Sequence, residues 1–287
     1  MKLFDTHCHL NLSPLSEKWR QYWQEAQEAG VQKALLVGAD LENSRRAIEI
    51  AQAEGSGCLG AAIGLHPMVF LEENNSGQIS LQNEEISRPQ ATALIEEYEA
   101  QIAQLSNFPK QNVWAIGETG LEYYHLHERP DFDIIRGIQM ILFHKLIRLA
   151  NDWQKTLVLH LRDEETQVYD EVLEMILGEQ IQTKIILHCI SGSADFVQKA
   201  VQNPAVYVSF AGNVTFKNAQ NIRDLVSAVP KNRFLIETDA PFLAPEPKRG
   251  TFPCTPAMVA QTAQYLENNF QIELAQVYQN SHEVFNL

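Results

Sequence analysis

The sequence predicts an α/β protein, a single (β/α)8 TIM-type barrel with one long insertion after its third strand. Eight short apolar runs alternate with longer amphipathic stretches, and histidines and acids recur where the apolar runs end. The 287 residues suit a barrel of this type. With 45% hydrophobic and 20% charged residues, the composition is that of a globular protein with one large core. We therefore expect residues 1–287 to form one domain.

The eight apolar runs are rich in Val, Ile and Leu, as is typical of parallel strands that are buried on both faces. A strand followed by a helix, repeated eight times, favours a closed parallel barrel because each right-handed crossover places a helix outside. An open doubly wound sheet is the alternative, but no GxGxxG motif follows the first strand. The predicted strands are Leu3–His9, Lys33–Ala39, Cys58–His66, Val113–Gly117, Thr156–His160, Lys184–His188, Val206–Ala211 and Arg233–Thr238.

The stretches between these runs have helical periodicity, and several begin with an Asp, Ser or Asn that can cap a helix. The predicted helices are Glu17–Ala29, Glu42–Gly55, 91–105, Asp131–Asp152, Glu165–Leu177, Ser193–Val201, Asn218–Val229, 257–268 and 272–285.

One connection is much longer than the others and runs from Met68 to Asn112. Its segment 72–90 is rich in Asn, Ser, Glu and Gln, which indicates an excursion without regular structure. We interpret it as a surface insertion, and a lid over the active face is the alternative.

The charge and the cysteines narrow the classes of function. Lys and Arg number 22 and Asp and Glu 36, so the net charge is −14, and a polyanion could be attracted only by a local basic cluster or by bound cations. The four cysteines show no CxxC spacing, which argues against a disulfide scaffold or a zinc finger.

The sequence shows neither a signal peptide nor a membrane span, so we expect a cytoplasmic protein with no membrane partner. The sequence does not predict an oligomeric state.

Histidines and acids lie at the ends of six of the predicted strands. Because these ends meet at the mouth of a barrel, where barrel enzymes hold their catalytic groups, the side chains should converge. In a strand His7 and His9 point to the same side, while Cys8 points to the other. A lone strand histidine is often an ordinary core residue, but so many polar groups at one mouth would be costly to bury without cations. His66 ends the third strand, and the other strand ends carry the candidate ligands His7, His9, Glu118, His160, His188 and Asp239.

Two cations explain six donors better than one, because a single zinc ion takes about four ligands. We expect His7, His9 and Asp239 to hold one ion, His160 and His188 to hold the other, and Glu118 to bridge both. Zinc suits the imidazoles, and the carboxylates also admit manganese or magnesium. Two such cations would activate a water for ester hydrolysis, with Glu118 and Asp239 in the catalytic machinery.

Two further residues are candidates for substrate binding. Arg162 lies two residues beyond His160 and could clamp a phosphate oxygen, or it could form a structural ion pair with Glu237. His66, which precedes Pro67, could contact substrate or have a core or capping role.

In combination, six sequence blocks resemble the TatD family of metal-dependent deoxyribonucleases, a branch of the amidohydrolase-like superfamily. The resemblance runs along nearly the whole chain. It implies metal ligation by His7, His9, Glu118, His160, His188 and Asp239, a proton-accepting role for Asp239, and exonuclease-like hydrolysis of DNA. The blocks are residues 4–10, 64–67, 116–121, 160–163, 188–192 and 237–245.

The sequence departs from the family pattern at Glu122, where the family usually has Asp, at Leu161, and in the segment Thr251–Pro256. None of these changes removes a ligand, but they bear on the choice of substrate. DNA, as single strands or ends, is the expected partner. The alternative is a D-aminoacyl-tRNA deacylase, or another small ester or amide hydrolase, that uses the same metal site. A scaffold without activity would require ligand loss, and no ligand is lost.

Overall fold

The computed structural model describes residues 1–71, 85–124, 126–178 and 180–287. Its eight strands are all parallel and follow one another in the order β1 to β8. This order confirms the barrel and excludes the doubly wound sheet, in which the strand order reverses. The strands are β1 Leu3–Cys8, β2 Val31–Val37, β3 Leu59–Ile63, β4 Val113–Glu122, β5 Thr156–Arg162, β6 Ile185–Leu187, β7 Val206–Phe210 and β8 Phe234–Ile236.

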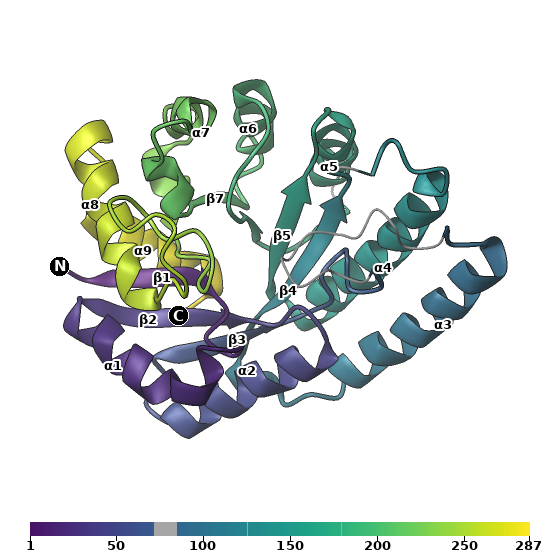
Figure 1. Cartoon of the computed structure of the whole chain (residues 1–287), viewed down its shortest axis with the longest axis horizontal. Helices are drawn as coiled ribbons and strands as arrows, with labels where there is room; N and C mark the ends of the chain where they lie inside the picture. The colour runs from purple at the N-terminus through teal and green to yellow at the C-terminus, as the bar shows by residue number, and fades with distance from the viewer. Residues whose placement is uncertain (72–84, 125, 179) are drawn as a thin grey trace.

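Helices alternate with the strands and lie outside them (Figure 1). The last two helices, in yellow, lie beside the purple β1, so the two ends of the chain are neighbours in space (Figure 1). The helices are α1 Trp19–Glu28, α2 Leu41–Glu54, α3 Arg88–Leu105, α4 Phe132–Trp153, α5 Gln167–Leu177, α6 Ala194–Ala200, α7 Gln220–Val226, α8 Val259–Phe270 and α9 Leu274–Phe285. Among the described residues, none of these helices combines the length and apolarity that crossing a membrane requires.

The ring of strands closes between β1 and the segment that follows β8. The Asp239 N–H donates to the His7 carbonyl oxygen (2.9 Å), and the His9 N–H donates to the Ala240 carbonyl oxygen (2.7 Å). The buried Asp5 carboxylate accepts from both the N–H and the hydroxyl of Thr238, at 2.9 and 2.6 Å. Closure therefore places the beginning of the chain directly against the residues around Asp239.

The interior of the barrel is apolar at its base. Phe285, from α9, contacts Phe4 and Trp114 at ring-centroid distances of 5.4 and 6.1 Å, and these rings fill the end where the strands begin. Buried residues of every strand join this cluster, whereas the opposite end of the barrel holds histidines and acids. The polar mouth is thus supported by a tightly packed floor.

Several boundaries differ from the predicted ones. β4 continues five residues beyond Gly117, because its pairing with β5 runs on to Glu122 and Arg162. The Gln139 amide of α4 also bonds the N–H and the carbonyl oxygen of Glu122 (2.9 and 3.0 Å). β8 is shorter than predicted and ends at Ile236, and α7 covers only the middle of 218–229.

The long connection between β3 and β4 contains the predicted helix, but α3 begins at Arg88 rather than at residue 91. A capping box explains the earlier start, because Ser87 and Gln90 bond each other and Pro89 occupies the first turn. Residues 72–84 of the predicted 72–90 excursion lie outside the described residues, so its role as an insertion or a lid stays a prediction.

Candidate metal centre

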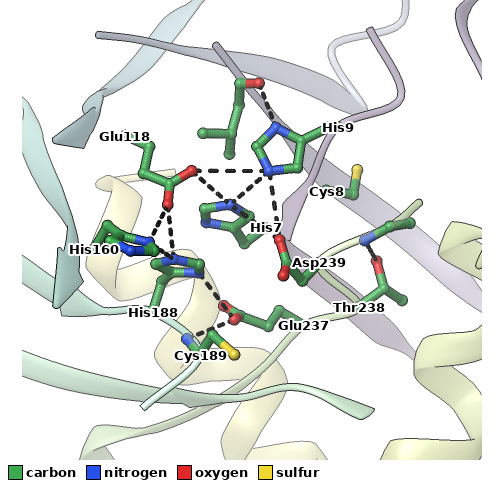
Figure 2. Close-up of polar contacts among 12 residues, drawn as sticks. His7, Cys8, His9, Glu118, His160, His188, Cys189, Glu237, Thr238 and Asp239 are labelled. Atoms are coloured by element: carbon green, nitrogen blue, oxygen red, sulfur yellow. Dashed lines mark hydrogen bonds and ion pairs between the residues drawn. The ribbon is translucent and has the colours of Figure 1, made fainter. Parts of the chain in front are cut away.

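The six predicted ligands lie together at the mouth of the barrel (Figure 2). His7, Glu118 and His160 belong to β1, β4 and β5, while His9, His188 and Asp239 follow β1, β6 and β8 within three residues. Sequence separations of up to 232 residues are bridged here because all these strands are parallel and end at the same rim. Their convergence was predicted from their common position at strand ends.

Glu118 lies between two groups of imidazoles. Its Oε2 atom faces His7 Nε2 at 3.5 Å and His9 Nε2 at 3.8 Å. Its Oε1 atom faces His160 Nδ1 at 2.8 Å and His188 Nε2 at 2.9 Å. Figure 2 shows the two oxygens directed to different histidines. This is the arrangement that a bridging carboxylate requires.

Asp239 completes the group on the β1 side. Its Oδ1 atom is 3.4 Å from His9 Nε2 and 3.7 Å from His7 Nε2. Asp239 has φ +57°, a left-handed conformation that Asp tolerates better than most residues, and it turns the chain back after β8. This turn places the carboxylate next to the two histidines of the first strand.

The donor atoms fit divalent cations. His7 Nε2 lies 3.2 Å from His9 Nε2, and His160 Nδ1 lies 3.3 Å from His188 Nε2. Two ligands about 2.0–2.1 Å from one tetrahedral zinc ion are roughly 3.3 Å apart, so each pair has the spacing of a shared ion. Among the described residues, three overlapping groups of donors qualify by geometry: His7, Glu118 and His188; His7, His9 and Asp239; and His66, Glu118 and His160.

The electrostatics of these side chains agree with this interpretation. Burial alone would raise the pKa of Glu118, but the neighbouring His188 and hydrogen bonds with His160, His188 and His7 hold it well below its usual value. Burial alone would lower the pKa of His160, but Glu118 and Glu122 raise it to about 9. Protons on imidazoles therefore balance the buried carboxylates, and cations would compete with these protons for the same lone pairs.

His66, which was predicted to contact substrate, lies directly beside two of the proposed metal ligands. Its Nε2 atom is 3.8 Å from Glu118 Oε1, and its ring centroid is 4.5 Å from that of His160. The Met68 N–H donates to His66 Nδ1 (3.2 Å), so in the neutral ring the proton is on Nε2. Burial, together with the nearby His160, lowers the pKa of His66 to about 3. The ring thus presents an N–H donor to the site, which suits a substrate contact.

Arg162 does not form the alternative ion pair with Glu237. Its guanidinium lies over the Tyr124 ring, 4.0 Å from the ring centroid, and its Nη1 atom is 4.0 Å from Glu122 Oε2. The side chain is 54% exposed. Glu237 is instead fully buried beneath His188, where its Oε1 atom is 3.3 Å from Nδ1 and accepts from the Cys189 N–H (2.7 Å).

Sequence reasoning did not assign the functions of the two acids behind the ligands, Glu122 and Glu237. Each lies at or near a strand end, Glu122 four residues after Glu118 and Glu237 two residues before Asp239, and this spacing was the available signal. The spacing alone does not say which side chain each acid meets, because its partners come from other strands.

Comparisons with known proteins agree with the geometry. The family model described as TatD related DNase matches residues 4–286. The chain is 33% identical over 252 residues to YabD of Bacillus subtilis, named an uncharacterized metal-dependent hydrolase, with 86% of this chain and 84% of that protein covered. It is 32% identical over 283 residues to a Mycoplasma pneumoniae protein of the same description, with 97% and 96% covered.

Among solved structures, YJJV, a TatD homologue from Escherichia coli K12, superposes with a TM-score of 0.76 at 25% identity and covers 99% of this chain and 98% of its own. An organophosphorus hydrolase from Deinococcus radiodurans shares the fold at 12% identity, with a TM-score of 0.59 and coverage of 99% and 92%. The ligand set and the family match along the chain together show that this protein belongs to the TatD family and is a metal-dependent hydrolase.

Proposed function

We propose that this protein hydrolyses phosphodiester bonds in DNA, acting on single strands or free ends in an exonuclease-like manner. The proposal rests on the position of Glu118, because its two carboxylate oxygens face two different sets of imidazoles. A centre that holds two cations is the arrangement that stabilises both the attacking and the leaving oxygen of a displacement at phosphorus.

In this proposal His7, His9 and Asp239 hold one divalent cation, His160 and His188 hold the other, and Glu118 bridges them. Zinc, manganese and magnesium all suit these donors. When bound, the cations would lower the pKa of a water and neutralise charge on the phosphate. Asp239 would accept the proton of that water, and its side chain, which is 15% exposed and lies 3.7 Å from His7 Nε2, supports this role.

Two side chains at the mouth support a nucleic-acid substrate. Arg162 presents a half-exposed guanidinium that can bind a phosphate oxygen bidentately. Phe242 is 50% exposed, and its ring centroid is 6.3 Å from that of His9, so it offers a surface on which a base could stack. Such local contacts would offset the unfavourable net charge of −14.

The direct test is hydrolysis of an end-labelled single-stranded oligonucleotide by the purified protein with manganese, magnesium or zinc. We expect cleavage that a chelator abolishes, and a loss of at least about 100-fold in kcat for His160→Ala and Glu118→Gln. Glu165→Gln, an exposed acid on the β5–α5 loop, is the matched control and should retain full activity.

A second substrate in the same assay distinguishes the alternative chemistry. If the protein releases the amino acid from a D-aminoacyl ester of tRNA and leaves oligonucleotides intact, the DNase proposal is wrong and the deacylase activity takes its place. Hydrolysis of DNA that survives loss of all six ligands would also overturn it.

We also propose a cytoplasmic location. All four cysteines, Cys8, Cys58, Cys189 and Cys254, are unpaired thiols in the structure, which suits a reducing compartment.

A further inference from the structure

Glu122 is a buried carboxylate on the far side of His160 from Glu118. Its Oε2 atom lies 2.8 Å from His160 Nε2, while His160 Nδ1 lies 2.8 Å from Glu118 Oε1. The other oxygen of Glu122 accepts from the Tyr124 N–H at 3.1 Å, and the residue is 4% exposed. The ring of His160 is therefore held between two carboxylates, one toward the proposed cations and one away from them.

The position of Glu122 is fixed by the sheet and by α4. Gly120 pairs with His160, and Glu122 pairs with Arg162, in the parallel register of β4 and β5. Residues two apart in a strand share a face, so Glu122 and Gly120 lie on the same side of β4. The buried Gln139 amide, from α4, bonds both backbone polar groups of Glu122 (2.9 and 3.0 Å). Backbone and side chain are thus both anchored before any ligand binds.

A neutral imidazole carries its proton on one nitrogen and can bind a cation only through the other. A carboxylate beside Nε2 favours the proton there, which leaves the lone pair on Nδ1. We propose that Glu122 is a positioning residue that selects this tautomer of His160 and so directs Nδ1 to the second cation. This inference rests on the proposed function, because it requires that a cation binds next to His160.

The other histidines of the centre are oriented in the opposite sense. His9 Nδ1 bonds the Val37 carbonyl oxygen (2.9 Å), and His188 Nδ1 faces Glu237 (3.3 Å), so both rings present Nε2 to the centre. Among these three rings, only His160 presents Nδ1. Glu122 also contacts none of the donors proposed for the first cation, so its loss should affect the two cations unequally.

The test compares cation binding by the wild-type protein and by Glu122→Gln. Glutamine has nearly the same shape but only one acceptor oxygen, so it cannot accept from both Tyr124 N–H and His160 Nε2–H. Zinc is titrated into the chelator-treated proteins by calorimetry, and bound zinc is counted by elemental analysis. We expect one of two zinc ions to bind about 10- to 100-fold more weakly in the variant, with the other unchanged.

Glu165→Gln serves as the matched control and should bind both ions as the wild type does. The unchanged first ion in Glu122→Gln also shows that the variant is folded. Two zinc ions bound with wild-type affinities by Glu122→Gln would overturn the positioning role while leaving the proposed function intact. Failure of the wild-type protein to bind a second ion would overturn both.

A second readout reports the tautomer directly. In the zinc-loaded wild-type protein, long-range ¹H–¹⁵N spectra of the histidine rings should show His160 protonated at Nε2, assigned by its absence in His160→Gln. Zinc bound to Nδ1 requires the ring proton on Nε2, so a proton on Nδ1 of His160 would contradict the inference.

Discussion

At the scale of single residues, the charge of Glu118 is the feature on which the centre depends. A carboxylate that is only 3% exposed would be costly to bury alone, yet five imidazole nitrogens lie within 3.8 Å of its two oxygens. Burial by itself would raise the pKa of Glu118, but His188 and the hydrogen bonds with the imidazoles lower it, so the ionised form of the acid is favoured. An ionised, centrally placed carboxylate is what a pair of divalent cations requires.

Gly120 cannot be replaced by a residue with a side chain unless His160 is displaced. A Cβ atom at Gly120 would lie 2.1 Å from the His160 carbonyl oxygen, and the glycine has φ +142°. We expect Gly120→Ala to lower the free energy of unfolding by at least about 2 kcal/mol and to reduce activity, as measured by urea unfolding and DNA hydrolysis.

Gly137→Ala is the matched control. Gly137 lies within α4, and no atom is within 4 Å of its added Cβ, so alanine there should be neutral or should stabilise by about 0.5–1 kcal/mol. Equal effects of the two substitutions would show that contact with β5 does not matter at Gly120.

Arg162 is expected to bind substrate rather than to take part in the chemical step. With Arg162→Ala we expect KM for single-stranded DNA to rise about 10-fold, equivalent to ~1.4 kcal/mol, with kcat changed less than about twofold. Arg162→Lys keeps the charge but loses the planar fork, so it should restore only part of the affinity. A large fall in kcat with constant KM would contradict this role.

Among the elements, one buried ion pair joins two of the connections that follow strands at the mouth of the barrel. Asp131, just before α4, accepts from Arg129 Nε and Nη2 at 2.8 Å each and from the Ile86 N–H at 2.7 Å. Arg129 and Asp131 lie in the connection between β4 and α4, whereas Ile86 lies in the connection between β3 and α3. The Asp131 carboxylate thus joins two connections through residues that are 45 positions apart in the sequence.

Asp131→Asn should lower the free energy of unfolding at pH 7 by about 3 kcal/mol, because it leaves the buried Arg129 without its counter-charge. Urea unfolding measures the change, and Asp133→Asn in the first turn of α4 is the control, with an expected loss below about 1 kcal/mol. Losses of equal size would show that the pair contributes nothing specific.

The same pair predicts a dependence on pH. Burial by itself would raise the pKa of Asp131, but the hydrogen bonds from Arg129 and Ile86 lower it below its usual value. A lowered folded-state pKa means that this stabilisation is complete above about pH 4 and is lost as the pH falls through the folded-state value. The difference between wild type and Asp131→Asn should therefore shrink on acidification below pH 4.

At the scale of the whole molecule, the centre joins the beginning, middle and end of the chain. The proposed ligands come from β1, β4 and β5 and from the segments after β6 and β8, and β1 meets the β8 end through backbone hydrogen bonds. Cations bound there would act as cross-links between distant segments in the native state only. Stability and cation binding should therefore be coupled.

Removal of cations should lower the stability of the whole barrel. At a free cation concentration 100 times the Kd, each ion contributes about 2.7 kcal/mol, so a chelator should lower the free energy of unfolding by about 5 kcal/mol. Calorimetric melting should show a lower Tm that returns when zinc is added back. Glu118→Gln should show little response to the chelator, and an unchanged Tm in the wild type would contradict the coupling.

The amino-acid sequence was enough to predict the barrel and the six side chains that converge at its mouth. Both follow from local signals: apolar runs of strand length, helical periodicity between them, and a polar residue wherever a run ends. Since parallel strands in a closed barrel share one rim, position at a strand end is enough to predict that His7 and Asp239 meet. The extent of β4 and the start of α3 were misplaced, because pairing with β5 and the Ser87 capping box determine these ends.

The orientation of these side chains became visible only in the folded protein. The tertiary structure directed the two oxygens of Glu118 to different histidines, placed Glu122 behind His160 and Glu237 behind His188, and set Arg162 against Tyr124 rather than Glu237. The physical reason is that a side chain's partners depend on the register between neighbouring strands and on the rotamers that packing permits. Neither is encoded in the spacing of residues along one strand.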